Sequence, residues 1–349
     1  MPCRLPQRLL IGSILALLAL CSATASAQPT KFRTVQFCFW NVENLFDDRV
    51  NPKLEKVDRE FDQWFARDKE ALSHKLARMV DVLLSKEMNR GVGPDILAMA
   101  EVESLRAVEL VRDALNAKLK DKALHYKHIA YLDPHGGRSI ATAVLSRVPF
   151  ARDKTPRLLG RGQRMLEVTL VEGKHELVVM ASHWTSRVSD GRGTGRAGYA
   201  QQIYRNFAEA YKKSPGVKYL VCGDFNDAPT DESVTRHLNA TGDVKKVLAL
   251  GKGDRPLFYS PFAEMVKDKK GTHFYQGQPY IFDNICLSPG LLEPGGWSYV
   301  PKSAAIVELL QFRGRPDRFG GPADRRPWRN RGASDHFPVT VELRVPVSK

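Results

Sequence analysis

Ser334-Asp335-His336 places a carboxylate directly beside an imidazole, near the C-terminal end of the 349-residue chain. The pair follows a Gly-Ala turn and precedes an apolar run over residues 337–345. A carboxylate binds hard metal ions, and an imidazole changes its charge near neutral pH. Taken by itself, an adjacent Asp and His is weak evidence for a site.

Four other polar stretches also stand where apolar runs are interrupted. They contain Asn41, Glu101, His183 with Trp184, and Asp224 with Asn226. Glu101 ends the run Asp95–Ala100, and a carboxylate at the end of a buried strand lies at a sheet edge, where a hard cation can be held. The alternative is an ordinary acidic residue that begins the next helix, as Glu103 does.

Gly223-Asp224-Phe225-Asn226 is the sharpest of these motifs. Asp224 and Asn226 are two residues apart, so an extended chain projects both side chains toward the same side. They supply one group that can accept a proton and one amide that can hold a phosphate or water. An Asx-rich turn, which needs the same residue types, is the structural alternative.

Asp283 interrupts the apolar run Tyr280–Leu287 with a carboxylate. An unpaired buried carboxylate is costly, so Asp283 needs a partner. A histidine is a natural partner, because the carboxylate stabilises its imidazolium form.

These side chains require a set of strands to position them, and apolar patterning predicts one. Strands are expected over residues 34–42, 95–100, 128–132, 141–146, 165–171, 176–182, 218–222, 280–287 and 337–345. Helices are expected over residues 68–88, 104–119 and about 200–211, with a short one ending near residue 238. Residues 44–64 are expected to form a long loop with short helical pieces, residues 241–280 are irregular, and residues 312–331 suggest a mobile loop. The elements indicate two packed sheets flanked by helices.

Residues 1–27 are expected to be a secretory signal peptide. Arg4 and Arg8 precede an apolar run over residues 9–20, and Ala25-Ser26-Ala27 is a small-residue cleavage site before Gln28. A lipoprotein cut before Cys21 is the alternative, although Leu20 is bulky for that processing. We therefore expect a secreted or periplasmic protein whose domain spans residues 28–349. No later stretch is long and apolar enough to span a membrane.

The chain carries a formal charge of +14, and removing residues 1–27 takes away two arginines and no acids, which leaves +12. A strongly basic exported protein suits an anionic partner such as nucleic acid, a phospholipid surface or a cell-wall polyanion. Cys38, Cys222 and Cys286 each lie in an apolar run, so we expect buried thiols. One disulfide among them is the alternative.

The ordered motifs FWNVENLF, DILAMAEVE, HW, GDFND, DNI and SDHFP make the chain resemble the endonuclease/exonuclease/phosphatase superfamily, to which pancreatic DNase and exonuclease III belong. It is most similar to the exported bacterial nuclease-like branch, which also carries FWNVENLF and HWxSR stretches. The resemblance covers about the whole chain after residue 27. It implies a four-layer α/β sandwich with two central, mainly antiparallel sheets flanked by helices. It also implies hydrolysis of a phosphoester with Mg²⁺ or Mn²⁺, or Ca²⁺ as an alternative.

The resemblance also implies roles for single residues. Glu101 is the expected metal ligand, with Asn41 beside it and Asp335 reaching metal or water. Asp224 orients or deprotonates the attacking water, Asn226 positions it or the phosphate, and His183 is a candidate acid for the leaving oxygen. His336, held by Asp283, binds the phosphate and stabilises the transition state. Which of Asp224 and the histidines is the base stays open.

The leading hypothesis is a monomeric, non-specific nuclease that acts on DNA, with RNA as the second choice. The contacts expected for substrate come from four residues that adjoin the motifs: Arg138, Trp184, Arg187 and Arg329. The Arg-rich segments 187–196 and 313–331 would grip the flanking phosphates. A phospholipid or sphingomyelin phosphodiesterase is the alternative, with Phe258, Tyr259, Phe262 and Phe274 to enter a lipid interface. A catalytically silent binding protein is a third hypothesis. The presence of all the main motif residues argues against it.

Overall fold

A computed structural model gives the fold and describes Met1 and residues 31–52, 54, 56–134, 138–160, 164–251, 253 and 255–347. Residues 31–349 form a compact unit of their own. The expected signal peptide, its cleavage point at Ala27-Gln28, and Cys3 and Cys21 lie outside the described residues. Among the helices that are described, none has the length and apolar character needed to cross a bilayer.

The first sheet is built around β1 (Phe32–Leu45), which pairs antiparallel with β18 (Val339–Pro346) and parallel with β2 (Ile96–Val102). The strand order is β14-β18-β1-β2-β4-β3, with β15 also paired to β18. The remaining strands are β3 (His128–Tyr131), β4 (Ala141–Ser146), β14 (Ser298–Tyr299) and β15 (Ala305–Ile306).

The second sheet has the order β5-β6-β7-β8-β13-β10-β9. Its strands are β5 (Arg157–Leu158), β6 (Met165–Glu172), β7 (His175–His183), β8 (Tyr219–Asp224), β9 (Ala240–Thr241), β10 (Phe258–Tyr259) and β13 (Asp283–Leu287). β7 and β8 are parallel, as are β9 and β10, and the other pairs are antiparallel. This pattern confirms the prediction of two mainly antiparallel sheets.

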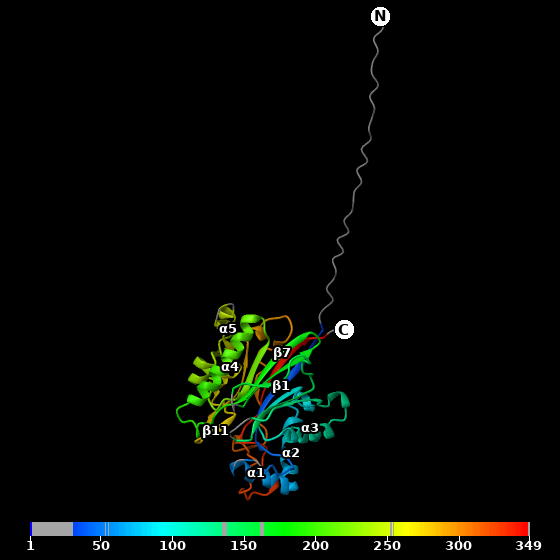
Figure 1. Ribbon diagram of the computed structural model, residues 1–349, viewed down its shortest axis with the longest axis vertical. Helices are drawn as coiled ribbons and strands as arrows, with labels where there is room; N and C mark the ends of the chain where they lie inside the picture. The colour runs from blue at the N-terminus through cyan, green and yellow to red at the C-terminus, as the bar shows by residue number, and fades with distance from the viewer. Residues whose placement is uncertain are drawn as a thin grey trace. The chain divides into compact units, whose positions relative to one another are not determined.

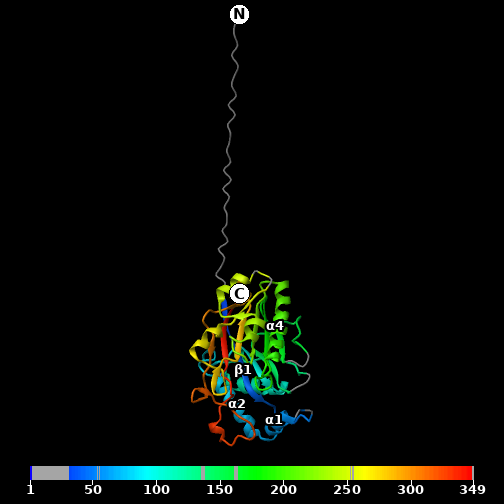
Figure 2. The same cartoon turned by 90° about the vertical axis from the view of Figure 1, so that its left-hand side faces the viewer.

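Helices cover the outer face of each sheet, so the fold has four layers (Figures 1 and 2). α2 (Lys69–Leu83) and α3 (Leu105–Lys118) pack on the first sheet, beside α1 (Lys56–Arg67). α4 (Thr194–Lys213) packs on the second sheet, near α5 (Val244–Leu250). The predicted four-layer α/β sandwich is therefore confirmed.

β1 shows why its sequence lacks a simple alternation of apolar and polar residues. Val35, Phe37 and Phe39 point into the core between the sheets, whereas Cys38 and Trp40 point into the core under the helices. All five side chains are buried. A strand covered on both faces must be apolar at every position.

Three stretches that were expected to be irregular contain regular structure. The expected loop over residues 44–64 begins inside β1 and includes most of α1, and residues 241–280 contain α5 and the hairpin of β11 (His273–Tyr275) and β12 (Gln278–Tyr280). Residues 312–331 were expected to form a mobile loop, but they fold through a two-stranded hairpin, β16 (Gln311–Phe312) and β17 (Arg315–Pro316), and a short 3-10 helix, η6 (Trp328–Asn330).

Tertiary contacts explain two of these differences, those over residues 44–64 and 312–331. Phe61, Trp64 and Phe65 of α1 pack with Phe319 and Trp328, and this aromatic cluster orders both segments at once. The three cysteines, in contrast, match the expectation, because Cys38, Cys222 and Cys286 are buried free thiols.

Candidate active site

Strand register brings three predicted residues into one row across the second sheet. Asp224 at the end of β8 lies opposite His183 at the end of β7 and opposite Asp283 at the start of β13. Parallel neighbours such as β7 and β8 end at the same sheet edge, which is why residues 41 positions apart in the chain meet. All three side chains are buried.

The first sheet contributes Asn41 and Glu101 from the neighbouring ends of β1 and β2. Asn41 Nδ2 donates to Glu101 Oε1 at 3.1 Å and to Asp224 Oδ2 at 3.0 Å, so one amide joins the two sheets. Its own Oδ1 accepts from the Glu43 backbone N–H at 3.1 Å. Asn41 therefore presents N–H groups to the carboxylates, and its predicted role as a metal ligand stays a prediction.

Backbone conformation aims Glu101 at the site. β2 changes register between Ala100 and Val102, and Glu101 has a φ of 64°, which is a left-handed conformation. Glu43, Asn44 and Asn226, all beside the site, also have positive φ. The Asn44 backbone N–H donates to Glu101 Oε2 at 2.9 Å and fixes the carboxylate. Strained backbone that clusters in this way is characteristic of functional sites.

His336 is held by Asp283, and its surroundings favour the charged form. Its Nδ1 lies 2.7 Å from Asp283 Oδ2, and both residues are buried. Burial favours the neutral imidazole, but the carboxylates of Asp283 and Asp224 outweigh it and raise the pKa of His336 well above its usual value. The predicted pairing of a buried Asp with a His is confirmed.

His183 has the opposite protonation state. Burial lowers its pKa well below the usual value, and Arg164 and His336 add to this effect. Its Nδ1 is buried without a hydrogen-bond partner among the described residues. The surroundings therefore favour a neutral His183 and a charged His336, and both rings lie beside Oδ2 of Asp224.

The carboxylates and imidazoles of the site lie close together but beyond hydrogen-bond distance of one another. Asp224 Oδ2 lies 3.7 Å from His183 Nε2 and 3.8 Å from His336 Nε2, and His183 Nε2 lies 3.8 Å from Glu101 Oε1. These separations exceed ordinary hydrogen bonds, so these groups do not satisfy one another directly. Burial raises the pKa of Asp224 to about 7, against the opposing effect of His336, so Asp224 is suited to exchange a proton near neutral pH.

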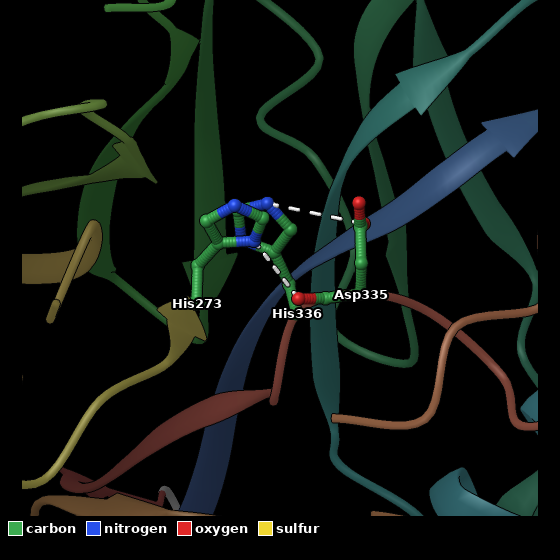
Figure 3. Close-up of side chains that lie close together, drawn as sticks. All are labelled: His273, Asp335 and His336. Atoms are coloured by element: carbon green, nitrogen blue, oxygen red, sulfur yellow. Dashed lines mark hydrogen bonds and ion pairs between the residues drawn. The ribbon is translucent and has the colours of Figure 1, made fainter. Parts of the chain in front are cut away.

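Asp335 and His273 lie beside His336 and extend the site (Figure 3). The His273 and His336 rings stack with centroids 4.2 Å apart, and Asp335 Oδ1 lies 4.0 Å from His336 Nε2. His273 Nδ1 lies 2.9 Å from the Asp335 backbone oxygen. Burial opposes ionisation of Asp335, but His336, His273 and Arg318 lower its pKa.

The donor set fits a hard divalent cation. Glu101 and Asp335 offer carboxylate oxygens, which Mg²⁺, Mn²⁺ and Ca²⁺ prefer. No donor of the described residues hydrogen-bonds the carboxylate of Asp335, whose side chain is 34 % exposed. Two groupings of the described residues bring ligand atoms within 4.8 Å of one another: His273 with Asp335 and His336, and Asp224 with Asp283 and His336. Asp335 belongs to the first grouping, and Glu101 belongs to neither.

The four residues predicted to contact substrate lie in different surroundings. Trp184 is fully buried and stacks on Phe225, with ring centroids 4.2 Å apart, so its side chain cannot touch a substrate. That prediction is corrected: Trp184 belongs to the core, and only its backbone oxygen serves the site, by accepting from Asn226 Nδ2 at 3.2 Å.

The arginines next to the site already bind other protein groups. Arg187 Nε donates to the Asn226 backbone oxygen at 3.0 Å, and its guanidinium pairs with Asp227 and Asp231. Arg138 donates to Asp58 and to Asn44 Oδ1, next to Glu101.

Arg329 makes no ion pair with a carboxylate of the described residues. It is exposed in η6, and its carbonyl accepts from Arg78 of α2.

Four of the ten arginines in the two Arg-rich segments form ion pairs, one of them being Arg187. Arg196 pairs with Asp190 and Asp227, Arg318 with Glu43, and Arg326 with Asp317 and Asp324. The expected contact of the two segments with flanking phosphates stays a prediction, which depends on their exposed arginines. The arginines that remain exposed there are Arg192, Arg313, Arg315, Arg325 and Arg329, along with half of Arg318.

Sequence reasoning missed two residues at the site: Lys75 and His273. Lys75 had a readable signal, because it falls on the apolar face of α2 between Leu72 and Met79. A lysine on a core-facing stripe predicts a buried ammonium with a definite partner. His273 had no such signal, since its neighbours Thr272 and Phe274 suit any short strand.

A comparison with protein families matches residues 36–345 to the endonuclease/exonuclease/phosphatase family. No curated protein matches the chain. Among solved structures, D. rerio TDP2 complexed with a single-strand DNA product has 14 % identity and a TM-score of 0.52, covering 89 % of this chain and 98 % of its own. C. elegans TDP2 has 16 % identity and a TM-score of 0.50, covering 89 % and 97 %. An endonuclease/exonuclease/phosphatase family protein from Bacteroides thetaiotaomicron has 14 % identity and a TM-score of 0.52, covering 91 % and 100 %.

Proposed function

The chain belongs to the endonuclease/exonuclease/phosphatase family, and from this membership we propose that it is an exported nuclease that hydrolyses phosphodiester bonds of DNA. Family membership supports a metal-dependent phosphoesterase. The choice of nucleic acid, and of DNA before RNA, is the proposal.

One observation carries it: the convergence of Asp224, His183, His336 and Glu101, whose neighbouring side-chain atoms stand 3.7–3.8 Å apart. A phosphodiester needs positive charge against its anionic oxygens, a group that takes a proton from water, and help for the leaving oxygen. The site supplies each of these within one small volume.

The proposed division of labour follows from the protonation states. His336, an imidazolium held by Asp283, donates to a nonbridging phosphate oxygen and stabilises the charge that develops there. Asp224, with a pKa raised by burial to about 7, accepts a proton from the attacking water. Asn226 is fixed by its backbone N–H on Asp224 Oδ1 at 2.9 Å and orients the phosphate or water.

Glu101 and Asp335 would hold the divalent cation, which supplies Lewis-acid stabilisation of the phosphate and of the leaving oxygen. Asn41 fixes the Glu101 carboxylate relative to Asp224 through its two N–H donors. His183 stands beside both carboxylates and remains the candidate for protonating the leaving oxygen.

Charge favours nucleic acid as the substrate class. The chain carries +14, and exposed arginines, among them Arg192 and Arg329, remain free of carboxylate partners among the described residues. A backbone of repeating phosphates binds such a surface in a salt-dependent manner. The single-strand DNA product in the D. rerio TDP2 structure is a precedent on a similar fold.

The lipid alternative loses support. Phe258 and Phe262, two of the four aromatic residues proposed to enter a lipid interface, are fully buried. Tyr259 and Phe274 are only partly exposed. Export is proposed from residues 1–27 alone.

The test is incubation of purified mature protein with plasmid DNA, RNA and sphingomyelin, each with Mg²⁺, with Mn²⁺ or with EDTA. We expect DNA cleavage that requires the metal and weakens as salt is raised. Hydrolysis of sphingomyelin alone would replace the proposal with the lipid alternative, and cleavage undiminished by EDTA would refute the metal-dependent mechanism.

A further inference from the structure

Lys75 is the most deeply placed cation near the site and has no part in the chemistry proposed above. Its side chain is fully buried in α2. Its ammonium donates to three backbone oxygens: Val42 at 2.6 Å, Glu43 at 3.1 Å and Ala333 at 2.7 Å. An ammonium has three N–H donors, so each is satisfied.

The three acceptors belong to two segments that carry site residues. Val42 and Glu43 follow Asn41, in the stretch where β1 loses its register with β2. Ala333 precedes Ser334-Asp335-His336. Backbone carbonyls in an irregular, buried stretch need donors from elsewhere, and Lys75 provides them to both segments at once.

A second contact ties the same two segments. Ser334 Oγ donates to the Asn41 backbone oxygen at 2.7 Å and accepts from the His336 backbone N–H at 3.1 Å. Lys75 and Ser334 therefore fix where the end of β1 lies relative to Asp335 from two directions.

A buried ammonium is expensive, and its surroundings explain why it persists. Burial lowers the pKa of Lys75 to about 8, while Glu43, Asp335 and Glu101 act to raise it. The ring of Phe319 also lies below the ammonium, with its centroid 5.1 Å from Nζ. A methionine of similar length would fill the same volume but would supply neither a charge nor hydrogen-bond donors. The contribution that distinguishes Lys75 is therefore its three hydrogen bonds.

We propose that Lys75 is a positioning residue for the cation site: by binding the carbonyls of Val42, Glu43 and Ala333, it sets the separation of Glu101 and Asp335. Asn41 and Asn44 connect Glu101 to the end of β1, and Ala333 connects directly to the segment of Asp335. The inference rests on the proposed function only in assigning Glu101 and Asp335 to a divalent cation.

Coulomb's law and positioning predict opposite results for Lys75→Met. Removing a positive charge beside Asp335 and Glu101 would, by charge alone, tighten binding of a divalent cation. Loss of positioning would weaken it, because ligands that are no longer oriented typically lose about 10- to 100-fold in metal affinity. We expect weakening of this size.

The experiment is a titration of the full mature protein with Mn²⁺, read by the electron paramagnetic resonance signal of the free ion, which needs no substrate. The control is Lys69→Met, which removes an exposed lysine from the same helix. It should leave Mn²⁺ affinity unchanged. With DNA as substrate, Lys75→Met should raise the Mn²⁺ concentration for half-maximal rate by the same factor and lower kcat at saturating Mn²⁺ by less.

Unchanged or tighter Mn²⁺ binding by folded Lys75→Met would overturn the inference. If that variant does not fold, Ser334→Ala decides, since it releases the second tie without a buried charge: weaker binding supports positioning, and unchanged binding overturns it. A wild type that binds Mn²⁺ but cleaves no phosphodiester would refute the proposed function and leave this inference standing.

Discussion

Replacing Asp283 by Asn tests whether His336 acts as a cation. The substitution keeps the size of the side chain and removes the carboxylate that lies 2.7 Å from His336 Nδ1. Both residues are buried, so little water is available to take over the role of Asp283. Asp224, 3.8 Å from Nε2, would be the remaining carboxylate nearest to the imidazole.

The expected size follows from the contact that is lost. A hydrogen bond to a charged group contributes about 1.5–3 kcal/mol, which corresponds to about one to two pKa units. The pKa of His336 is raised in the folded protein, so the imidazolium is present below that pKa and is lost as the pH rises through it. Asp283→Asn should therefore move the alkaline limb of the activity profile to lower pH by one to two units.

The assay is initial-rate cleavage of DNA from pH 5 to 9.5 at saturating Mg²⁺. We expect kcat/KM to fall by about 10²-fold at pH 8 and by much less near pH 5.5, where the imidazolium is still populated. Nitrogen chemical shifts of the His336 ring would report the same change in pKa directly.

Asp95→Asn is the matched control. Asp95 is also a buried, ion-paired aspartate, 3.0 Å from Arg33, but it lies before β2, at the opposite end from Glu101. It should leave the pH profile unchanged. The reasoning would be refuted if Asp283→Asn lowered the rate equally at every pH, because that result would show a loss of structure and not of charge.

Three further substitutions test other parts of the structure. Asp224→Asn removes the proposed proton acceptor and should lower kcat about 10³-fold without unfolding, as checked by circular dichroism; a loss below tenfold would contradict the role. Arg187→Met releases the Asn226 carbonyl and should lower kcat about tenfold with little change in the salt dependence of KM, whereas a phosphate contact would reduce that dependence. Glu103→Gln removes a buried carboxyl whose pKa burial raises to about 7, so the cost of ionising it grows as the pH rises from the ordinary carboxyl pKa and is fully present above about pH 7. The variant should raise the free energy of unfolding in urea by about 1–3 kcal/mol at pH 8.5 and change it little at pH 4; equal effects at both pH values would refute this.

The sequence predicted the parts of the site in which a local pattern carries the information. Asn41, Glu101, His183 and Asp224 each end an apolar run, and a buried run that stops at a polar side chain marks a strand end at a sheet edge. The motif order then identified the family. Two packed sheets with aligned strands bring these strand ends together, so the predicted architecture was enough to predict a single site.

Long-range pairing is the part that the sequence could not show. Arg318 and Glu43 are 275 residues apart, and nothing in the run Phe312–Arg331 indicates which of its arginines form ion pairs with carboxylates of the protein. The same limit applies to Trp184, because an aromatic residue beside a histidine at a strand end suits both a substrate contact and a core position. In each case burial decides, and burial depends on segments that are distant in the chain.

The two histidines show how the fold assigns different roles to identical side chains. His336 has a buried carboxylate on Nδ1 and is a cation, whereas His183 Nδ1 has no partner among the described residues and the ring is neutral. A neutral His183 cannot begin the reaction as an acid. In the proposed mechanism it can protonate the leaving oxygen only after it has received a proton, and Asp224 Oδ2, 3.7 Å away, is the nearest source once that carboxylate has taken a proton from water. This order makes Asp224 the first base, and it predicts that His183→Ala slows substrates with a poor leaving group far more than substrates with a nitrophenolate leaving group, which needs no proton. Equal losses for both kinds of ester, measured as kcat, would remove His183 from the proton path.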